Sequence, residues 1–240
     1  MKYRCQTTSE IGFVQLLACN YIPHGYWFYV TGHVPAEKDP AAVDAKLLRK
    51  YRIDVSRATR CRRKAAGRAN VHYIRHGRFF VLLATHGKHR FFADEAGSIR
   101  DVREIPIQFA GYSIGCKRGE YLHVAGGKRA PRADGRYRSR VQVSRPVYLD
   151  WRAYFAELAE SASEQRLAFE LYRFPYEPYA PVRKQLLEIV RVVNRVRKQK
   201  GRSRLDAKRV IRFRRRIVRP FEPVAESDDS AAPRLLAVAG

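Results

Sequence analysis

One segment near the C-terminus, residues 183–219, carries sixteen Lys or Arg residues and only two acids, Glu188 and Asp206. It therefore supplies +14 of the formal net charge of +25. The apolar residues between these charges recur at helical spacing, which predicts that the segment folds rather than remaining a flexible tail. The apolar stripe of the first expected helix, from Val182 to Lys200, consists of Val182, Leu186, Ile189, Val190, Val193 and Val196.

The end of this stripe predicts a second helix. Gly201 can end the first helix in a left-handed conformation. Ser203 followed by Asp206 resembles a capping box, in which a hydroxyl and a carboxylate satisfy the first amides of the next helix. We expect this second helix to turn Val210, Phe213 and Ile217 inward, to carry the remaining basic residues and to end before Pro220.

The outer faces of these two helices are the first candidate site. Like charges one helical turn apart repel one another, and almost no acids are present to relieve the repulsion. Such a surface suits a polyanion, and we expect the phosphate backbone of DNA or RNA as its partner. The predicted contact residues are Arg191, Arg195, Lys198, Arg202, Lys208, Arg209, Arg212, Arg215, Arg216 and Arg219.

Two further basic segments join this prediction. Residues 125–138 are rich in Gly, Pro, Lys and Arg, which predicts a long exposed basic loop. The segment Ser56–Gly67 predicts a basic helix that ends at a glycine. The predicted contact residues of these two segments are Lys128, Arg129, Arg132, Arg136, Arg62 and Arg63.

The first 146 residues show strand signals mixed with helices. The clearest signal is a hairpin, in which Val71–Arg75 and Arg78–Ala84 flank a His76-Gly77 turn. After Pro146 the apolar spacing becomes helical. We therefore predict an α+β fold, with a mostly antiparallel sheet and packed helices followed by an all-helical basic part. The expected domains are residues 1–146 and 147–221, followed by a disordered tail at residues 222–240.

The histidines raise a catalytic alternative. His86 and His89 lie close to Asp94 and Glu95, so four potential metal ligands fall within ten residues. The pair resembles a degenerate form of the motif of HUH endonucleases, in which one apolar residue separates the histidines. That resemblance implies metal-dependent strand nicking, with Tyr112 as a candidate nucleophile. Histidines three positions apart on a strand point to opposite faces, however, so we favour a non-enzymatic function without a metal.

Composition limits the remaining classes. The four cysteines are scattered without a C-x-x-C pair, which favours reduced thiols over a zinc site. No P-loop motif occurs, and we expect no cofactor. The N-terminus lacks the apolar core of a signal peptide, and no apolar run reaches membrane-spanning length. We therefore expect a soluble, cytoplasmic protein without a membrane partner.

These observations favour a strongly basic nucleic-acid-binding protein. We expect an accessory role in a mobile element, a replication system or a ribonucleoprotein, with a protein of the same nucleoprotein complex as a second partner. Two alternatives stay open: the nicking endonuclease, and a structural ribonucleoprotein subunit whose basic helices fold on RNA. The sequence does not distinguish DNA from RNA. Amide side chains are among the groups that read bases, and Asn194 and Gln199 are the only ones near the basic residues of the first helix.

Overall fold

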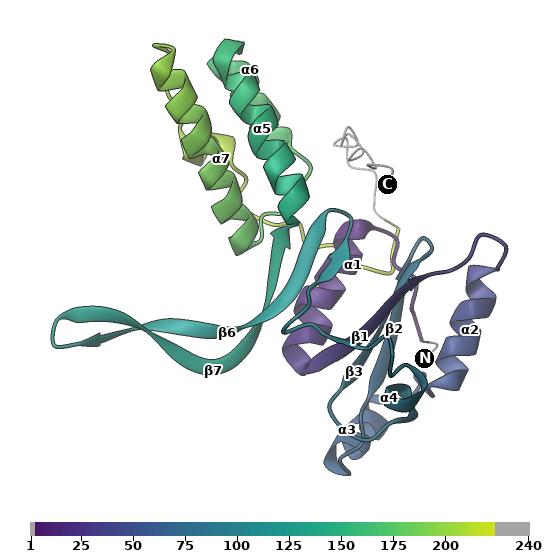
Figure 1. The fold of residues 1–240 in the computed structure, drawn as a ribbon. Helices are drawn as coiled ribbons and strands as arrows, with labels where there is room; N and C mark the ends of the chain where they lie inside the picture. The colour runs from purple at the N-terminus through teal and green to yellow at the C-terminus, as the bar shows by residue number, and fades with distance from the viewer. Residues whose placement is uncertain (1–2, 224–240) are drawn as a thin grey trace. The chain divides into compact units, whose positions relative to one another are not determined.

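A computed structural model describes residues 3–223 of the chain (Figure 1). Within them the chain forms helices and antiparallel strand pairs, so the predicted α+β class is confirmed. The described residues divide into two compact units. Unit 1 comprises residues 3–107, 114–140 and 218–223, and unit 2 comprises residues 108–113 and 141–217. The tail that was predicted to be disordered lies outside the described residues from residue 224 onward.

Unit 1 is built on a four-stranded sheet. Its elements are α1 (Glu10–Gln15), the π-helical turn η1 (Leu16–Tyr21), the 3-10 turn η2 (Ile22–His24), β1 (Tyr26–His33), α2 (Pro40–Lys50), α3 (Arg57–Ala65), β2 (Val71–His76), β3 (Phe79–Thr85), α4 (Arg90–Asp94) and β4 (Arg100–Asp101). The strand order is β2-β3-β1-β4, and neighbouring strands are antiparallel. The predicted hairpin is confirmed, with its turn one position later than expected, at Gly77 and Arg78.

The helices of unit 1 begin at the polar residues that the sequence offers. Asp39 caps α2, and its carboxylate accepts hydrogen bonds from the amides of Ala41 and Ala42 at 3.1 and 3.0 Å. Ser56 caps α3 by accepting from the amide of Thr59 at 3.1 Å. Each cap satisfies amides that have no partner inside the helix, which is why α2 and α3 start where they do.

A buried ion pair joins α2 to the sheet. Arg75 on β2 and Asp44 on α2 are both buried, and the guanidinium Nε and Nη2 lie 2.9 and 2.8 Å from the two carboxylate oxygens. The Tyr73 hydroxyl donates to the same carboxylate at 2.6 Å. Bidentate pairing with a further donor offsets the cost of removing both charges from water. The pair therefore fixes α2, and the basic residues at its end, on the sheet.

The segment predicted as a basic loop, residues 125–138, forms part of a β-hairpin instead. β6 (Tyr112–Ala125) pairs with β7 (Lys128–Val143), and β5 (Ile107–Phe109) lies on the other side of β6. Gly126 and Gly127 occupy the turn with positive φ. The prediction was wrong because paired strands satisfy their backbone groups even where side chains are basic rather than apolar. The Gly-Gly dipeptide was the available signal of a two-residue turn.

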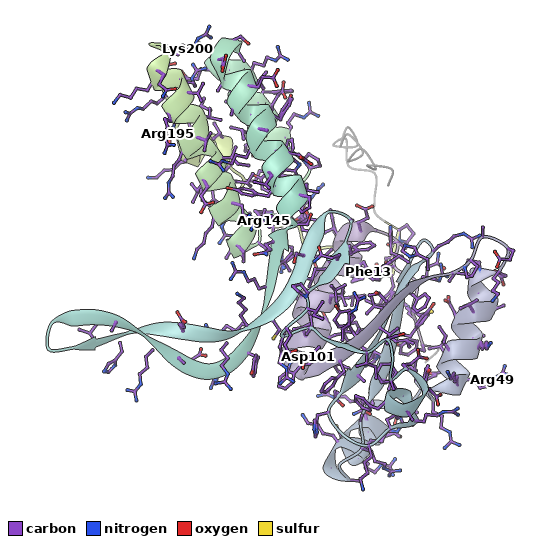
Figure 2. The ribbon with its side chains drawn as sticks, viewed as in Figure 1. Phe13, Arg49, Asp101, Arg145, Arg195 and Lys200 are labelled. Carbon is purple, nitrogen blue, oxygen red and sulfur yellow. The ribbon has the colours of Figure 1, made fainter. Side chains whose placement is uncertain are left out.

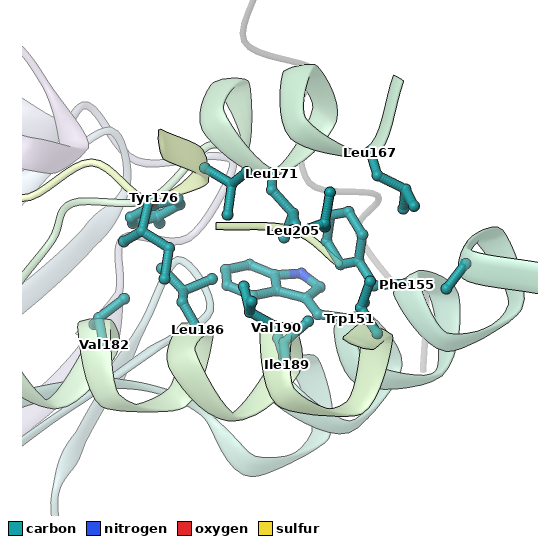
Figure 3. Packing of buried hydrophobic residues seen from close by; sticks show 14 of the residues in the cluster. Trp151, Phe155, Leu167, Leu171, Tyr176, Val182, Leu186, Ile189, Val190 and Leu205 are labelled. Atoms are coloured by element: carbon teal, nitrogen blue, oxygen red, sulfur yellow. The ribbon is translucent and has the colours of Figure 1, made fainter. Parts of the chain in front are cut away.

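Unit 2 contains the long helices α5 (Arg145–Ser161), α6 (Glu164–Arg173) and α7 (Ala180–Gln199), which pack around one apolar core (Figure 3). The stripe predicted for α7 is confirmed, since its residues are buried in this core or packed against it. The residues labelled in Figure 3 from these helices are Trp151, Phe155, Leu167, Leu171, Val182, Leu186, Ile189 and Val190.

The second basic helix is much shorter than predicted. α8 spans only Ala207–Val210, and its cap is Asp206 rather than Ser203. Residues 211–219 are not helical, so Phe213 and Ile217, which were predicted to face inward, are exposed while Val210 is buried. The amide of Arg212 donates to the Tyr176 hydroxyl at 3.0 Å, and further along the amide of Arg216 donates to a buried carboxylate. Partners outside the segment thus take amide hydrogens that a helix would use internally, so the all-helical description holds for α5 to α7 but not for this segment.

We predict that Asp44→Asn lowers the free energy of unfolding by about 3–5 kcal/mol, because it leaves the buried Arg75 guanidinium without a counter-charge. Urea unfolding followed by circular dichroism measures the loss. The control is Asp54→Asn, which neutralises an exposed carboxylate of the same unit and should change stability by less than about 0.5 kcal/mol. Equal effects of the two substitutions would contradict the structural role of the buried pair.

A second prediction concerns acid sensitivity. His72 on β2 lies among the rings of Tyr3, Tyr21 and Tyr26. Burial, and then the positive charge of Arg60, lowers the pKa of His72 from 6.5 to about 3. As the pH falls, His72 therefore becomes protonated near pH 6.5 in the unfolded chain but only near pH 3 in the folded protein. The free energy of unfolding should fall as the pH drops through this window, by about 1.4 kcal/mol per pH unit.

His72→Gln isolates this contribution. The glutamine amide offers both a donor and an acceptor to the Tyr3 hydroxyl, which lies 2.8 Å from the imidazole Nδ1. Urea unfolding of both proteins at several pH values below 6.5 gives the comparison. The wild type should lose stability more steeply than the variant, and parallel curves would show that His72 does not titrate on unfolding.

Candidate nucleic-acid interface

The outer face of α7 carries a row of exposed cations. Arg191, Arg195 and Lys198 lie at positions i, i+4 and i+7 of the helix, and Figure 2 shows Arg195 projecting from it. The only acid on α7, Glu188, accepts a hydrogen bond from the Tyr148 hydroxyl at 2.9 Å. The structure thus brings these three predicted contact residues together on one solvent-exposed face.

Arg202, another of the predicted contact residues, donates its hydrogen bonds to backbone carbonyls of unit 2. α7 ends at Gln199, and the Arg202 guanidinium donates to the carbonyls of Ser161 and Ala162 at 2.7 and 3.1 Å. The buried Arg197 donates to the same Ala162 carbonyl at 2.9 Å. Carbonyls at the end of a helix have no partner within it, and these two arginines satisfy those of α5. Arg202 therefore holds the ends of α5 and α7 together.

Arg212 and Arg216 are also tied to the protein. The Arg212 guanidinium donates to the carbonyl of Phe174 at 2.9 Å and to that of Tyr176. The Arg216 Nε lies 3.1 Å from the carboxylate of Glu177, which is buried. These two predicted contact residues hold the irregular segment after α8 against the connector between α6 and α7. The charge of Arg216 is neutralised in place.

The other predicted contact residues between positions 183 and 219 differ in their surroundings. Lys208 and Arg209 are exposed on α8. The guanidinium of Arg215 lies over an aromatic ring. Arg219 belongs to unit 1 and pairs with Glu222 at 2.8 Å. The structure does not bring these four residues together with the α7 row into one helical face.

The other predicted contact residues lie in unit 1. Arg62 is exposed on α3, and Arg132 and Arg136 are exposed on β7. The backbones of Lys128 and Arg129 belong to β7, but their side chains lie outside the described residues. The hairpin therefore displays part of the charge that the sequence assigned to a loop.

Unit 1 also has a basic surface that the sequence revealed only in part. Two adjoining concavities of about 770 and 280 Å³ open beside α2, α3 and the start of α4. The basic residues that line the first are Lys46, Arg49, Lys50, Arg52 and Arg90. Those that line the second are Arg52, Arg63, Arg68, Lys88 and Arg90. We call these eight residues the basic groove; Figure 2 labels Arg49.

Of the basic groove, only Arg63 was among the predicted contact residues. The groove gathers cations from three stretches of the sequence, 46–52, 63–68 and 88–90, and none of them holds as many cations as residues 183–219. A charge count along the chain therefore does not reveal it. In the sequence, the glycine after α3 and the glycine before Lys88 indicate that the chain turns at these two positions. They do not indicate that the two turns lie next to each other in the fold.

The acids of the metal alternative are ion-paired. Asp94 lies 3.3 Å from the Lys50 Nζ and 3.2 Å from the Arg90 Nε. Glu95 lies 3.5 Å from the Lys50 Nζ and accepts from the Tyr51 hydroxyl. Burial acts to raise the pKa of Asp94, but the hydrogen bonds and charges of Lys50 and Arg90 lower it overall. These carboxylates partly neutralise the basic groove.

The two histidines of this alternative do not join them. His89 caps α4, accepting from the Phe91 amide at 3.0 Å, and burial followed by the charge of Arg63 lowers the pKa of its imidazole. His86 is exposed, with its ring centroid 6.4 Å from that of Phe28. In residues 3–223, no three His, Cys, Asp or Glu side chains gather where they could hold a metal ion.

Tyr112 is poorly suited to nucleophilic attack. Its hydroxyl accepts a hydrogen bond from the Glu177 amide at 2.9 Å. Burial raises the pKa of Tyr112 well above its usual range, and the charge of Glu177 adds to the increase. A tyrosine nucleophile needs a lowered pKa or an adjacent base, whereas the pKa of Tyr112 is raised and the nearby Glu177 carboxylate is paired with Arg216. The geometry therefore favours a structural role for Tyr112.

No family model, no curated protein and no solved structure matches this chain. Across the described part of the chain, every helix is too short or too polar to cross a membrane. Only the geometry and charge of the described residues therefore bear on function.

We predict that Tyr112→Phe destabilises the protein by about 1–3 kcal/mol, because the Glu177 amide loses its acceptor. We also predict that neither wild type nor variant forms a denaturant-resistant adduct with single-stranded DNA in the presence of Mg²⁺. Urea unfolding and denaturing gels provide the two measurements. Tyr172→Phe, at an exposed position of α6, serves as the matched control for stability. A wild-type adduct that the Tyr112 variant lacks would restore the nicking alternative.

Proposed function

We propose that this protein binds nucleic acid, DNA or RNA, through the phosphate backbone. The observation that carries the proposal is the row formed by Arg191, Arg195 and Lys198 on α7. All three are exposed, and the only acid of the helix is engaged with Tyr148. The proposed role is that of an accessory factor in a nucleoprotein complex, such as one of a mobile element, a replication system or a ribonucleoprotein.

Stability alone does not explain this row. Elsewhere in unit 2, arginines contribute to the fold by donating to carbonyls, as Arg197 and Arg202 do at the end of α5. Arg191 and Arg195 instead lie one turn apart and repel each other, which costs a helix about 0.2–0.5 kcal/mol per pair. A ligand that brings negative charge removes this cost, so the row favours an anionic partner.

The spacing of the row suits a polymer of phosphates. A helix rises about 1.5 Å per residue, so Arg191, Arg195 and Lys198 follow one another at about 4.5–6 Å along the axis. Such a row can contact successive phosphates of one backbone, and each contact releases condensed counterions. The same face lacks a large apolar residue between its charges, which favours phosphate contacts over insertion into a lipid layer.

The test is the salt dependence of binding by a variant that carries Arg191→Gln, Arg195→Gln and Lys198→Gln. Each lost contact should make the slope of log K against log salt shallower by about 0.9 on duplex DNA and about 0.7 on a single strand. Fluorescence anisotropy with labelled duplex DNA, single-stranded DNA and RNA measures the slopes and shows which nucleic acid is preferred.

The matched control removes the same charge from other helices of unit 2. It carries Arg152→Gln, Arg166→Gln and Arg173→Gln, at exposed positions of α5 and α6. The control should keep a slope near that of the wild type. If both variants lose the same slope, the α7 row has no special role, and a wild type that binds none of the three nucleic acids contradicts the proposed function.

A further inference from the structure

The basic groove of unit 1 concentrates charge that the fold does not neutralise. Five basic residues line each of its two concavities, and Arg52 and Arg90 line both, which gives eight in total. Among the described residues, ion pairs reach only Lys50 and Arg90 of these eight, through Asp94 and Glu95. Six cations of the groove therefore lack a carboxylate partner in the described part of the chain.

The crowding acts on the groups inside the groove. The guanidinium of Arg63 donates to the Arg52 carbonyl at 3.2 Å, which holds it close to its neighbours. Burial lowers the pKa of Arg63, and the charges of Arg68, Arg52 and Arg60 lower it further. The folded protein therefore holds like charges together at an electrostatic cost, which a bound anion would remove.

Arg52 lies in the groove with a backbone conformation that is unfavourable for a residue with a side chain. The amide of Arg52 donates to the Arg49 carbonyl at 3.2 Å, and the amide of Ile53 donates to the Leu48 carbonyl at 2.9 Å. This pair of hydrogen bonds is the Schellman ending of a helix, which requires a left-handed residue. Arg52 supplies it with φ +48°. A side chain in this conformation is strained, whereas glycine is not.

Two other helices of this protein end in the same way, with a glycine at the left-handed position. α3 and α7 finish with equivalent pairs of hydrogen bonds, and their left-handed residues are Gly67 and Gly201, with φ +66° and +64°. Only at the end of α2, among these three helices, does a charged residue occupy the position. That residue lines both concavities of the basic groove. The strain thus coincides with the site, as strain at functional sites often does.

A second backbone device brings Arg68 and Lys88 side by side. The Lys88 amide donates to the Gly67 carbonyl at 3.0 Å, and the Ala69 amide donates to the Lys88 carbonyl at 3.2 Å. Gly87 has φ +130°, and a Cβ there would lie 2.7 Å from the Ala69 nitrogen. Glycine at this position therefore permits the close approach of two segments that each deliver a cation to the groove.

The lining residues indicate what kind of anion fits. Besides the eight cations, they are alanines and His89, with no large aromatic ring and no Asn or Gln. Such a surface attracts phosphate charge, but it offers no large ring on which a base could stack and no amide that could read adenine. The two concavities share Arg52 and Arg90, so the charge continues over more than one phosphate-sized site.

We propose that the basic groove binds consecutive phosphates of one nucleic-acid strand, independently of base sequence. This inference rests on the proposed function and adds to it a second contact surface, located in unit 1. Arg52 is the central residue of the groove, because it lines both concavities and keeps its position at the expense of backbone strain.

Arg52→Gly tests the proposal with a variant that should fold better than the wild type. Glycine relieves the strain at φ +48°, so the Tm should rise. Loss of the guanidinium should weaken binding to two oligonucleotides of unrelated sequence by the same factor. The salt slope should become shallower by about 0.9 on duplex DNA or about 0.7 on a single strand.

Ala110→Gly is the matched control. Ala110 is the other non-glycine residue with positive φ in the described part of the chain, at +46°, and it lies in unit 2 outside the groove. This substitution should also raise the Tm while leaving affinity unchanged. A second groove variant, with Arg68→Gln and Lys88→Gln, should weaken binding without the rise in Tm.

The outcomes separate this inference from the proposed function. If the α7 variant binds more weakly but Arg52→Gly binds like the wild type, the groove is not a contact surface and the proposed function stands. A loss that differs between the two sequences would contradict a sequence-independent contact. If inorganic triphosphate competes as well as an oligonucleotide at equal phosphate concentration, the groove takes a small anion rather than a strand.

Discussion

Repulsion among positive charges is the constraint that the rest of this structure must satisfy. The chain has 48 Lys and Arg residues against 23 Asp and Glu, so fewer than half of its cations can have a carboxylate of their own. Part of the charge is used inside the fold. Arg197 and Arg212 donate to backbone carbonyls, and Arg75 pairs with a buried carboxylate. Arginine suits this use because its guanidinium carries five N–H donors and keeps its charge when buried.

Two groups of the cations that the fold does not use in this way are gathered rather than dispersed. The row on α7 and the basic groove each hold several like charges at close range, although dispersal would lower the repulsion. The backbone of Arg52 also carries a cost, because it occupies a left-handed position that Gly67 and Gly201 fill at equivalent helix ends. Two different physical costs therefore coincide at the groove, and an anionic ligand would relieve the electrostatic one.

Local patterns predicted the elements whose causes lie within a few residues. The apolar stripe of α7 and the hairpin around Gly77 both depend on neighbours in the sequence, and the structure confirms them. Two predictions were wrong where the cause lies elsewhere. β7 is stabilised by pairing with β6, and residues 211–219 are held out of a helix by Tyr176 and Glu177.

The sequence by itself determined that this protein has a large excess of positive charge, which segment holds the most of it and which helix displays it. Only the tertiary structure decided which cations remain available. Arg202 looks like a continuation of the row of Arg191 and Arg195, but it caps the end of α5. Arg52 and Lys88 lie far apart in the sequence, but they line one groove. The physical reason is that an arginine's partners, carbonyls or other cations, come from segments far apart in the chain, and sequence spacing does not encode those distances.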